Sequence, residues 1–313
     1  MNIKYSIRTD LAYDENQILV NKLDEKKKIV NGIEVIKHFI NEEQSKEVNK
    51  KTGNYYTIDL ANHNIRDTNT CVRIEKTLAD VLKEIINEKG LINKKCLIVG
   101  LGNINVTPDA LGPYVVDNVI VTRHLFELNK ISEGFSNVSA ISPGVMGTTG
   151  IETYDIISSV IKEIKCDYLI VVDALATSSV ARVNKTIQIT DSGINPGSGV
   201  GNKRKELSKD TLGIPVIALG VPTVVDSVTI TSDIIEYLLK HLEKVNEEKF
   251  LGDFGLLEEE TKRKMIKGIL EPNGFNMMVT PKEIDADIED LTKIISNSIN
   301  LSLHIGLYNG MSS

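Results

Sequence analysis

Residues 100–119 read GLGNINVTPDALGPYVVDNV, and this stretch decides the expected fold. The apolar run at 96–99 breaks into glycine and asparagine from Gly100 onward, and a helical pattern then begins at Asp109. A second apolar run at 168–172 ends in another acid, Asp173. Open α/β sheets place their chemistry outside the carboxyl ends of their strands, so the sequence predicts two carboxylates at one edge of a sheet.

Strand and helix patterns alternate outward from this stretch. Such alternation is typical of an α/β fold with a mostly parallel or mixed sheet covered by helices on both faces. The expected strands are residues 96–101, 138–141, 167–172, 186–190 and 214–220, and the expected helices are residues 77–89, 109–128, 150–165 and 232–244.

The two ends of the chain carry weaker patterns. Residues 1–75 are polar and predict a loosely specified lead-in with short β-like pieces, such as residues 55–60. After residue 246 the chain becomes charged and is expected to be rich in loops, before it ends in helical material at 281–303. We therefore expect an α/β core over about 76–245 and a C-terminal helical extension over about 246–313.

The composition favours a cytoplasmic globular protein. With a net charge of -7 the chain lacks the clustered lysine and arginine that nucleic-acid or membrane surfaces require, so neither is an expected partner. Its 3 cysteines are scattered, which indicates neither a disulfide framework nor a thiolate zinc site. The start of the chain has no signal-peptide pattern, and no apolar run approaches the roughly 18 residues that span a bilayer.

Each of the two acids also has a structural interpretation. Asp109 can cap the N-terminus of a helix, and Asp173 can be held by the amides of a following loop. Against this, an ionised carboxylate after an apolar strand is costly unless it is paired or used in chemistry. Glycines before Asp109 permit a tight turn, and Gly112 is expected to leave space for a bound group beside that acid.

Two carboxylates that face one cavity can divide the work of hydrolysis. One is ionised and takes a proton from water, and the other is protonated and donates to the leaving group, because like charges push their pKa values apart. The dinucleotide-binding pattern fits less well, since Asn105 stands where it needs a third glycine.

The stretch PGSGVGNKRK at 196–205 is similar in composition to a phosphate loop but lacks its spacing. We expect a glycine-rich loop with a basic tip that contacts acidic substrate. Its candidate residues are Gly197, Ser198, Gly199, Lys203 and Arg204.

Several longer blocks together resemble the spore germination protease family. They are residues 100–127, SPGVMGTTGIET at 142–153, VVDALA at 171–176, residues 188–208, residues 211–233 and NMMVTPKEID at 276–285. The resemblance implies an endopeptidase of the spore core that initiates degradation of small acid-soluble spore proteins during germination and uses no cofactor. It also implies that Asp109 and Asp173 are the catalytic pair of an atypical aspartic peptidase.

The same resemblance implies a fold related to the hydrogenase-maturation peptidases, which hold a metal with their acids and a histidine. No histidine follows Asp173 at a comparable strand end, so we expect no metal here. Two alternatives remain open: a metal-dependent maturation-type peptidase, and a catalytically silent protein that binds spore proteins.

The family is also made as a homotetrameric zymogen that removes its own N-terminal segment. TDLAYD at 9–14 resembles the substrate cleavage sequence, in which an acid precedes the cut and an apolar residue and alanine follow it. The resemblance places the cut between Asp10 and Leu11, so residues 1–10 are the expected propeptide and 11–313 the expected peptidase domain. Tyr13 departs from the small polar residue usual in substrates, and the stretch at about 244–261 is shorter than in family members generally.

Overall fold

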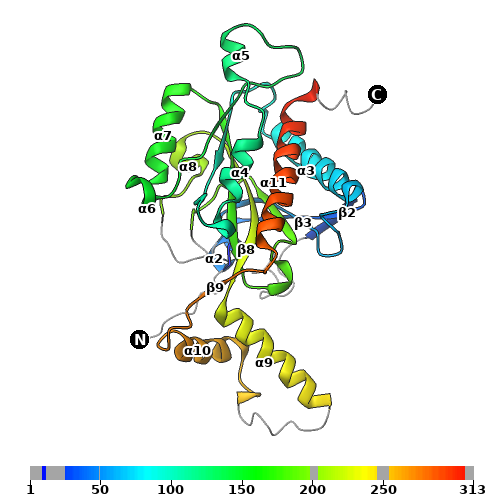
Figure 1. Cartoon of the computed structure of the whole chain (residues 1–313), viewed down its shortest axis with the longest axis vertical. Helices are drawn as coiled ribbons and strands as arrows, with labels where there is room; N and C mark the ends of the chain where they lie inside the picture. Colours follow the sequence, from blue (N-terminus) through cyan, green and yellow to red (C-terminus); the bar gives the residue numbers. More distant parts are fainter. Residues whose placement is uncertain (1–8, 12–24, 49, 198–203, 245–253, 307–313) are drawn as a thin grey trace.

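The chain folds around one mixed β-sheet. A computed structural model describes residues 9–11, 25–48, 50–197, 204–244 and 254–306. Within these residues the sheet has nine strands in the order β1-β2-β3-β7-β8-β6-β4-β5, with β9 paired to β8 outside this order. Helices pack around the sheet, as Figure 1 shows. The expected α/β class is confirmed, with the sheet mixed rather than mostly parallel.

The sheet consists of a parallel half and an antiparallel half. The parallel half contains β5 (Val138–Ile141), β4 (Cys96–Gly100), β6 (Tyr168–Thr177) and β8 (Val216–Asp226). The antiparallel half continues from β8 through β7 (Thr186–Thr190), β3 (Gly53–Asp59), β2 (Ile33–Ile40) and β1 (Glu25–Val30). The short β9 (Met278–Val279) is antiparallel to the end of β8.

The helices include three long ones and several short ones. The long helices are α3 (Thr68–Glu88), α9 (Ser227–Lys244) and α11 (Ile284–Leu303). The shorter α-helices are α2 (Glu42–Val48), α4 (Leu111–Asn118), α5 (Arg123–Glu127), α6 (Met146–Thr149), α7 (Thr153–Ile164), α8 (Lys209–Leu212) and α10 (Glu259–Leu270). The described part of the chain also has single turns of 3-10 helix at η1 (Thr107–Asp109) and η2 (Val180–Arg182).

The continuous helix expected at residues 109–128 is wrong. The structure divides this stretch into η1, α4 and α5. Asn118 ends α4 by donating its side-chain amide to the Tyr114 carbonyl oxygen, 2.8 Å away. Thr122 is then held by β5, because its hydroxyl oxygen accepts the Val138 N–H at 2.9 Å. These side-chain bonds compete with the helical hydrogen bonds that the apolar spacing alone predicts.

Residues 25–48 and 50–59 are more ordered than their polar composition indicates. The β-like piece expected at residues 55–60 is confirmed as β3, but the expectation of a loosely specified lead-in is wrong for β1 and β2, which extend the sheet from β3 as an antiparallel meander. Burial of apolar side chains explains why β2 joins the sheet, since Ile33, Val35 and Ile40 are buried. After residue 246, the helical material expected at 281–303 is confirmed as α11, and the stretch before it, which was expected to be rich in loops, also contains α10.

Alternate residues of β4 contribute to two hydrophobic clusters. Cys96 and Ile98 belong to a large cluster with residues of α3, α4 and α11. Leu97 and Val99 belong to a second cluster, which includes Ile157 and Ile161 of α7. Successive side chains of a strand point to opposite faces, so β4 is packed against other apolar side chains on both sides and is rigidly placed.

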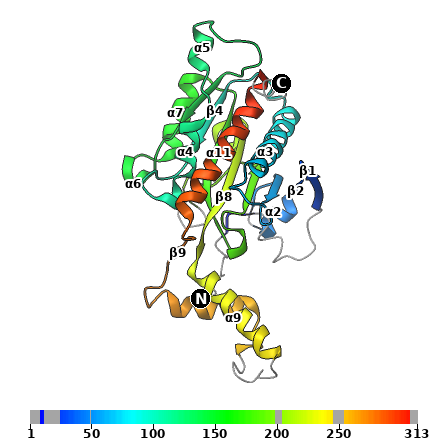
Figure 2. The same cartoon turned by 45° about the vertical axis from the view of Figure 1, so that its right-hand side comes forward.

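Helices α9 and α10 project together from the end of β8, away from the body that contains the sheet (Figures 1 and 2). Several large apolar side chains on this projection are exposed, among them Ile234, Tyr237 and Ile269. Of the helices in the described part of the chain, none combines the length and apolar character needed to cross a membrane.

Candidate functional site

Asp173 lies where β6 continues beyond the end of the neighbouring strand β4. β4 ends at Gly100, which pairs with Val172, so Asp173 is the first residue of β6 beyond β4. The side chain is buried, with 6% of its surface exposed. Its Oδ1 accepts the N–H of Ala174 at 3.0 Å. The carboxylate therefore sits at the carboxyl end of the parallel strands, as the sequence predicts.

Asp109 lies in η1, within the connection that leaves β4. Its Oδ2 accepts the Asn103 N–H at 2.8 Å, which closes the loop on itself. The residue at the N-terminus of α4 is Ala110, with no side-chain cap, so Asp109 is not the helix cap of the structural interpretation. The Thr223 hydroxyl of β8 donates to the Pro108 carbonyl oxygen at 2.6 Å and ties this turn to the sheet.

Glycines allow the loop and α4 to approach the strands closely. A Cβ on Gly102, whose φ is +118°, would lie 1.9 Å from the Asp109 carbonyl oxygen. A Cβ on Gly112 would lie 2.2 Å from the Leu101 carbonyl oxygen and 2.6 Å from that of Val172. The expectation that Gly112 leaves space for a bound group is wrong, because backbone fills that space. This glycine instead brings α4 against the two strand ends.

Both acids have a raised pKa, and the charge of Asp109 contributes to the shift of Asp173. Burial raises the pKa of Asp173 well above its usual range, and the nearby charges of Asp109 and Asp10 raise it further. Burial also raises the pKa of Asp109, which the hydrogen bond from Asn103 partly offsets. A carboxyl whose ionised form is disfavoured keeps its proton to higher pH, so the pair fits a site in which one acid is protonated and the other ionised.

A third acid, Asp10, lies along the same strand. Its backbone N–H donates to the Ala176 carbonyl oxygen at 2.9 Å, and its Oδ2 accepts the Ala176 N–H at 2.9 Å. Leu11 is 1% exposed. The Lys50 ammonium donates to the Thr9 carbonyl oxygen at 3.0 Å. The structure therefore brings residues 9–11 to the strand that carries Asp173.

The predicted basic loop is described only at its ends. Gly197 has a φ of +69°, and Arg204 Nη1 lies 3.7 Å from Glu152 Oε2. Ser198, Gly199 and Lys203 lie outside the described residues. Contact of this loop with substrate stays a prediction.

Sequence reasoning missed three contributors to this region. Lys50 stands in a lysine-rich polar stretch with no motif, and only its contact with Thr9 distinguishes it. Thr223 acts through its hydroxyl, inside an apolar strand pattern. Asp226 is a further buried acid at the end of a parallel strand, but its Oδ1 accepts the Thr229 N–H at 2.7 Å and so caps α9. A search for acids at strand ends would have found Asp226.

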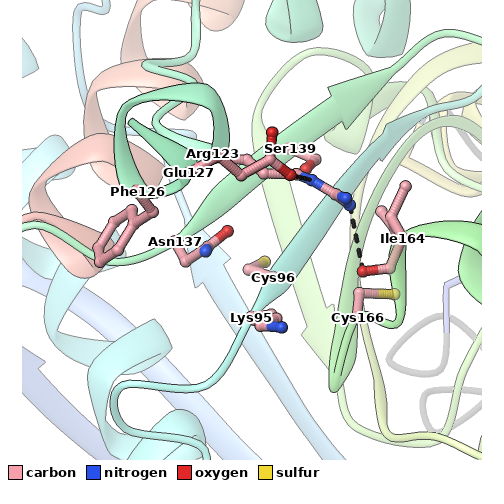
Figure 3. A pocket seen from close by; sticks show the side chains of 9 residues that line it. All are labelled: Lys95, Cys96, Arg123, Phe126, Glu127, Asn137, Ser139, Ile164 and Cys166. Carbon is pink, nitrogen blue, oxygen red and sulfur yellow. Dashed lines mark hydrogen bonds and ion pairs between the residues drawn. The ribbon is translucent and has the colours of Figure 1, made fainter. Parts of the chain in front are cut away.

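A pocket of about 180 Å³ lies at the opposite ends of the strands (Figure 3). Lys95 and Cys96 line it at the start of β4, and Cys166 lines it just before β6. Arg123 crosses the pocket to donate to the Ile164 carbonyl oxygen at 3.1 Å. Because open α/β sheets bind ligands at the carboxyl ends of their strands, we place the candidate site at Asp109 and Asp173.

The described residues contain no group of three or more histidine, cysteine, aspartate or glutamate side chains arranged to hold a metal ion. What the fold and the site define is an α/β protein with two interacting carboxyls at the carboxyl ends of its parallel strands. Such a pair suits acid–base chemistry.

Comparison with known proteins identifies the family. Residues 4–249 and 243–312 match the germination protease family. A germination protease of Bacillus cereus (strain AH187) is 48% identical, over 96% of this chain and 94% of that protein. Germination proteases of Bacillus mycoides (strain KBAB4) and Bacillus anthracis (strain CDC 684 / NRRL 3495) show the same identity and coverage. The chain belongs to the germination protease family and is a peptidase.

Proposed function

We propose that this peptidase is an endopeptidase that initiates the degradation of small acid-soluble spore proteins in the germinating spore core. It is made as a zymogen that cuts itself between Asp10 and Leu11, and Asp109 and Asp173 perform the hydrolysis. Membership of the germination protease family supports the activity. The burial of the two acids and the effect of the Asp109 charge on the pKa of Asp173 support their role.

The reaction needs one ionised and one protonated carboxyl. The ionised group takes a proton from water, whose oxygen bonds to the carbonyl carbon of the residue before the cut. The protonated group gives its proton to the amide nitrogen as the C–N bond breaks. A new carboxyl terminus and a new amino terminus result, and the two acids have exchanged protonation states.

One observation carries this proposal. The peptide bond that resembles a substrate cleavage site joins Asp10 and Leu11, and Asp10 is hydrogen-bonded to the strand that bears Asp173. The charge of Asp10 raises the pKa of Asp173. Leu11 is also buried, whereas terminal segments are usually exposed and poorly ordered unless contacts hold them in place.

Further features follow from the same proposal. Residues 1–10 are the propeptide and residues 11–313 the peptidase, which assembles as a homotetramer. The relation to the hydrogenase-maturation peptidases extends to the architecture, with helices on both faces of the sheet. The two clusters that share β4 support this arrangement.

The experiment that tests this function is digestion of a purified small acid-soluble spore protein by the full-length chain. We expect internal cleavage after an acidic residue, identified by mass spectrometry of the fragments. The matched control is Asp226→Asn, which removes a buried strand-end acid that caps a helix and leaves Asp109 and Asp173 in place. Binding of the spore protein without cleavage would favour the catalytically silent alternative.

A further inference from the structure

The end of β6 has an edge that extends beyond its pairing with β4, and an extended peptide can bind there. β4 stops opposite Val172, while β6 continues to Thr177. The Val172 carbonyl oxygen accepts the Leu101 N–H at 2.8 Å and so faces the side of β4. Alternate residues of a strand direct their backbone groups to the same side, so the Ala176 N–H and C=O face that side too. Asp10 makes a hydrogen bond with each of these two groups.

The contacts of residues 9–11 divide into general and selective ones. The Asp10 N–H and the Thr9 carbonyl oxygen are backbone groups that every extended peptide offers, and they meet the Ala176 carbonyl oxygen and Lys50. The bond from the Ala176 N–H to Asp10 Oδ2 is different, because it requires a side-chain acceptor. A charged acceptor makes such a bond stronger than a neutral one.

Lys51, the residue after Lys50, is anchored to the fold by several contacts. The Lys51 ammonium lies 2.9 Å from Asp210 Oδ2 and also pairs with Glu206. The Lys51 carbonyl oxygen accepts the Tyr55 hydroxyl at 2.8 Å. With the backbone anchored at Lys51, less backbone freedom is lost when Lys50 contacts the bound segment.

We infer that the edge of β6 beyond Val172, together with Lys50, is the substrate-binding subsite for the two residues before the cut. Its ligand is an extended peptide with an aspartate or glutamate at the second of these positions. The Ala176 N–H selects that acid, and Lys50 holds the carbonyl oxygen of the residue before it. The propeptide and the spore-protein substrate use this subsite in turn. The inference rests on the proposed function for the identity of the substrate.

Hydrogen exchange tests the docking without any cleavage. In the full-length Asp109→Asn chain, the Ala176 amide is expected to exchange slowly, because Asp10 accepts its proton. Adding Asp10→Ala removes the acceptor, and exchange at Ala176 should become at least about 10-fold faster. Equal exchange in the two chains would overturn the inference, whatever the protease activity proves to be.

Kinetics test the role of Lys50 in binding. The substrate is a synthetic peptide with the sequence of residues 5–14, added to the chain after it has cut itself between Asp10 and Leu11 and the subsite is free. We expect Lys50→Met to raise KM about 10- to 100-fold with a smaller change in kcat, since a hydrogen bond to a charged group is lost. Lys50→Arg should restore most of the affinity. Lys46→Met, which changes an exposed lysine on α2, is the matched control and should leave KM unchanged.

The outcomes separate the two proposals. If the wild-type chain cuts the peptide and Lys50→Met has the same KM, the subsite is wrong while the protease function stands. If the wild-type chain cuts neither the peptide nor spore protein, the function fails, and hydrogen exchange at Ala176 still decides whether the edge holds an acidic segment.

Discussion

At the scale of single residues, the chemistry depends on where the two carboxyls are buried. Burial raises the pKa of Asp173 because it disfavours the ionised form, and the charge of Asp109 raises that pKa further. A group that is costly to fold and that faces another acid is typical of a functional site. Substitutions of these two acids should therefore raise the stability of the protein while they lower its activity.

Asp173→Asn is expected to stabilise the fold at neutral pH. An aspartate has a pKa of about 3.9 when unfolded, and the pKa of Asp173 in the folded chain is raised. Between these two values the folded chain binds more protons than the unfolded chain, so the free energy of unfolding falls as pH rises through this window. The asparagine side chain does not ionise, so the variant does not lose this stability as pH rises.

Thermal unfolding across pH measures this effect. We expect the Tm of Asp173→Asn to exceed that of the wild type by a few degrees at pH 7 and the difference to vanish below about pH 4. Asp210→Asn is the control, because the pKa of Asp210 is lowered by Lys51 and no gain is expected there. A Tm for Asp173→Asn at or below the wild-type value at pH 7 would show that the carboxyl is not under electrostatic strain.

At the scale of elements, the connection from β4 to α4 sets the position of Asp109. Its closest packing is backbone against backbone at Gly112. The sequence predicted a strand, a glycine turn and an acid in this order, because apolar runs and glycine punctuation are local signals. It could not reveal that Gly112 packs against Leu101 and Val172, since that contact depends on how strands distant in sequence pair.

Gly112→Ala should destabilise the protein by about 3 kcal/mol and reduce hydrolysis by displacing the turn that holds Asp109. Gly268→Ala is the matched control, because it is also a helical glycine but a Cβ there meets nothing within 4 Å. The control should be neutral or more stable by up to about 1 kcal/mol. Urea unfolding measures both. Equal stability of the two variants would mean that α4 does not pack as closely as described.

The same limits explain other parts of the fold. The apolar strands of the parallel half could be predicted because each is a short continuous hydrophobic run. The strands β1 and β2 were missed because β1 is rich in lysine and mostly exposed, and because the pairing of β2 with β3 joins segments that are separated by α2. Lys50 was missed because its only distinguishing feature is a contact made across the fold.

At the scale of the whole molecule, the competing enzyme class is a metal-dependent peptidase. We expect the full-length protein to keep its activity on spore protein after dialysis against a chelator. Two carboxyls that share one proton supply both the acid and the base without a metal. Loss of activity on dialysis, with recovery on addition of zinc or nickel, would favour the metal-dependent alternative.

The central claim is that Asp109 and Asp173 cut the chain's own Asp10–Leu11 bond. The most direct measurement is intact mass spectrometry, with sequencing of the new N-terminus, on purified full-length chain incubated alone at mildly acidic pH. The wild type should lose residues 1–10 and begin at Leu11. Asp109→Asn and Asp173→Asn should each cut at least about 10³-fold more slowly. A wild-type chain that begins at another residue, or undiminished cleavage in either variant, would contradict the account.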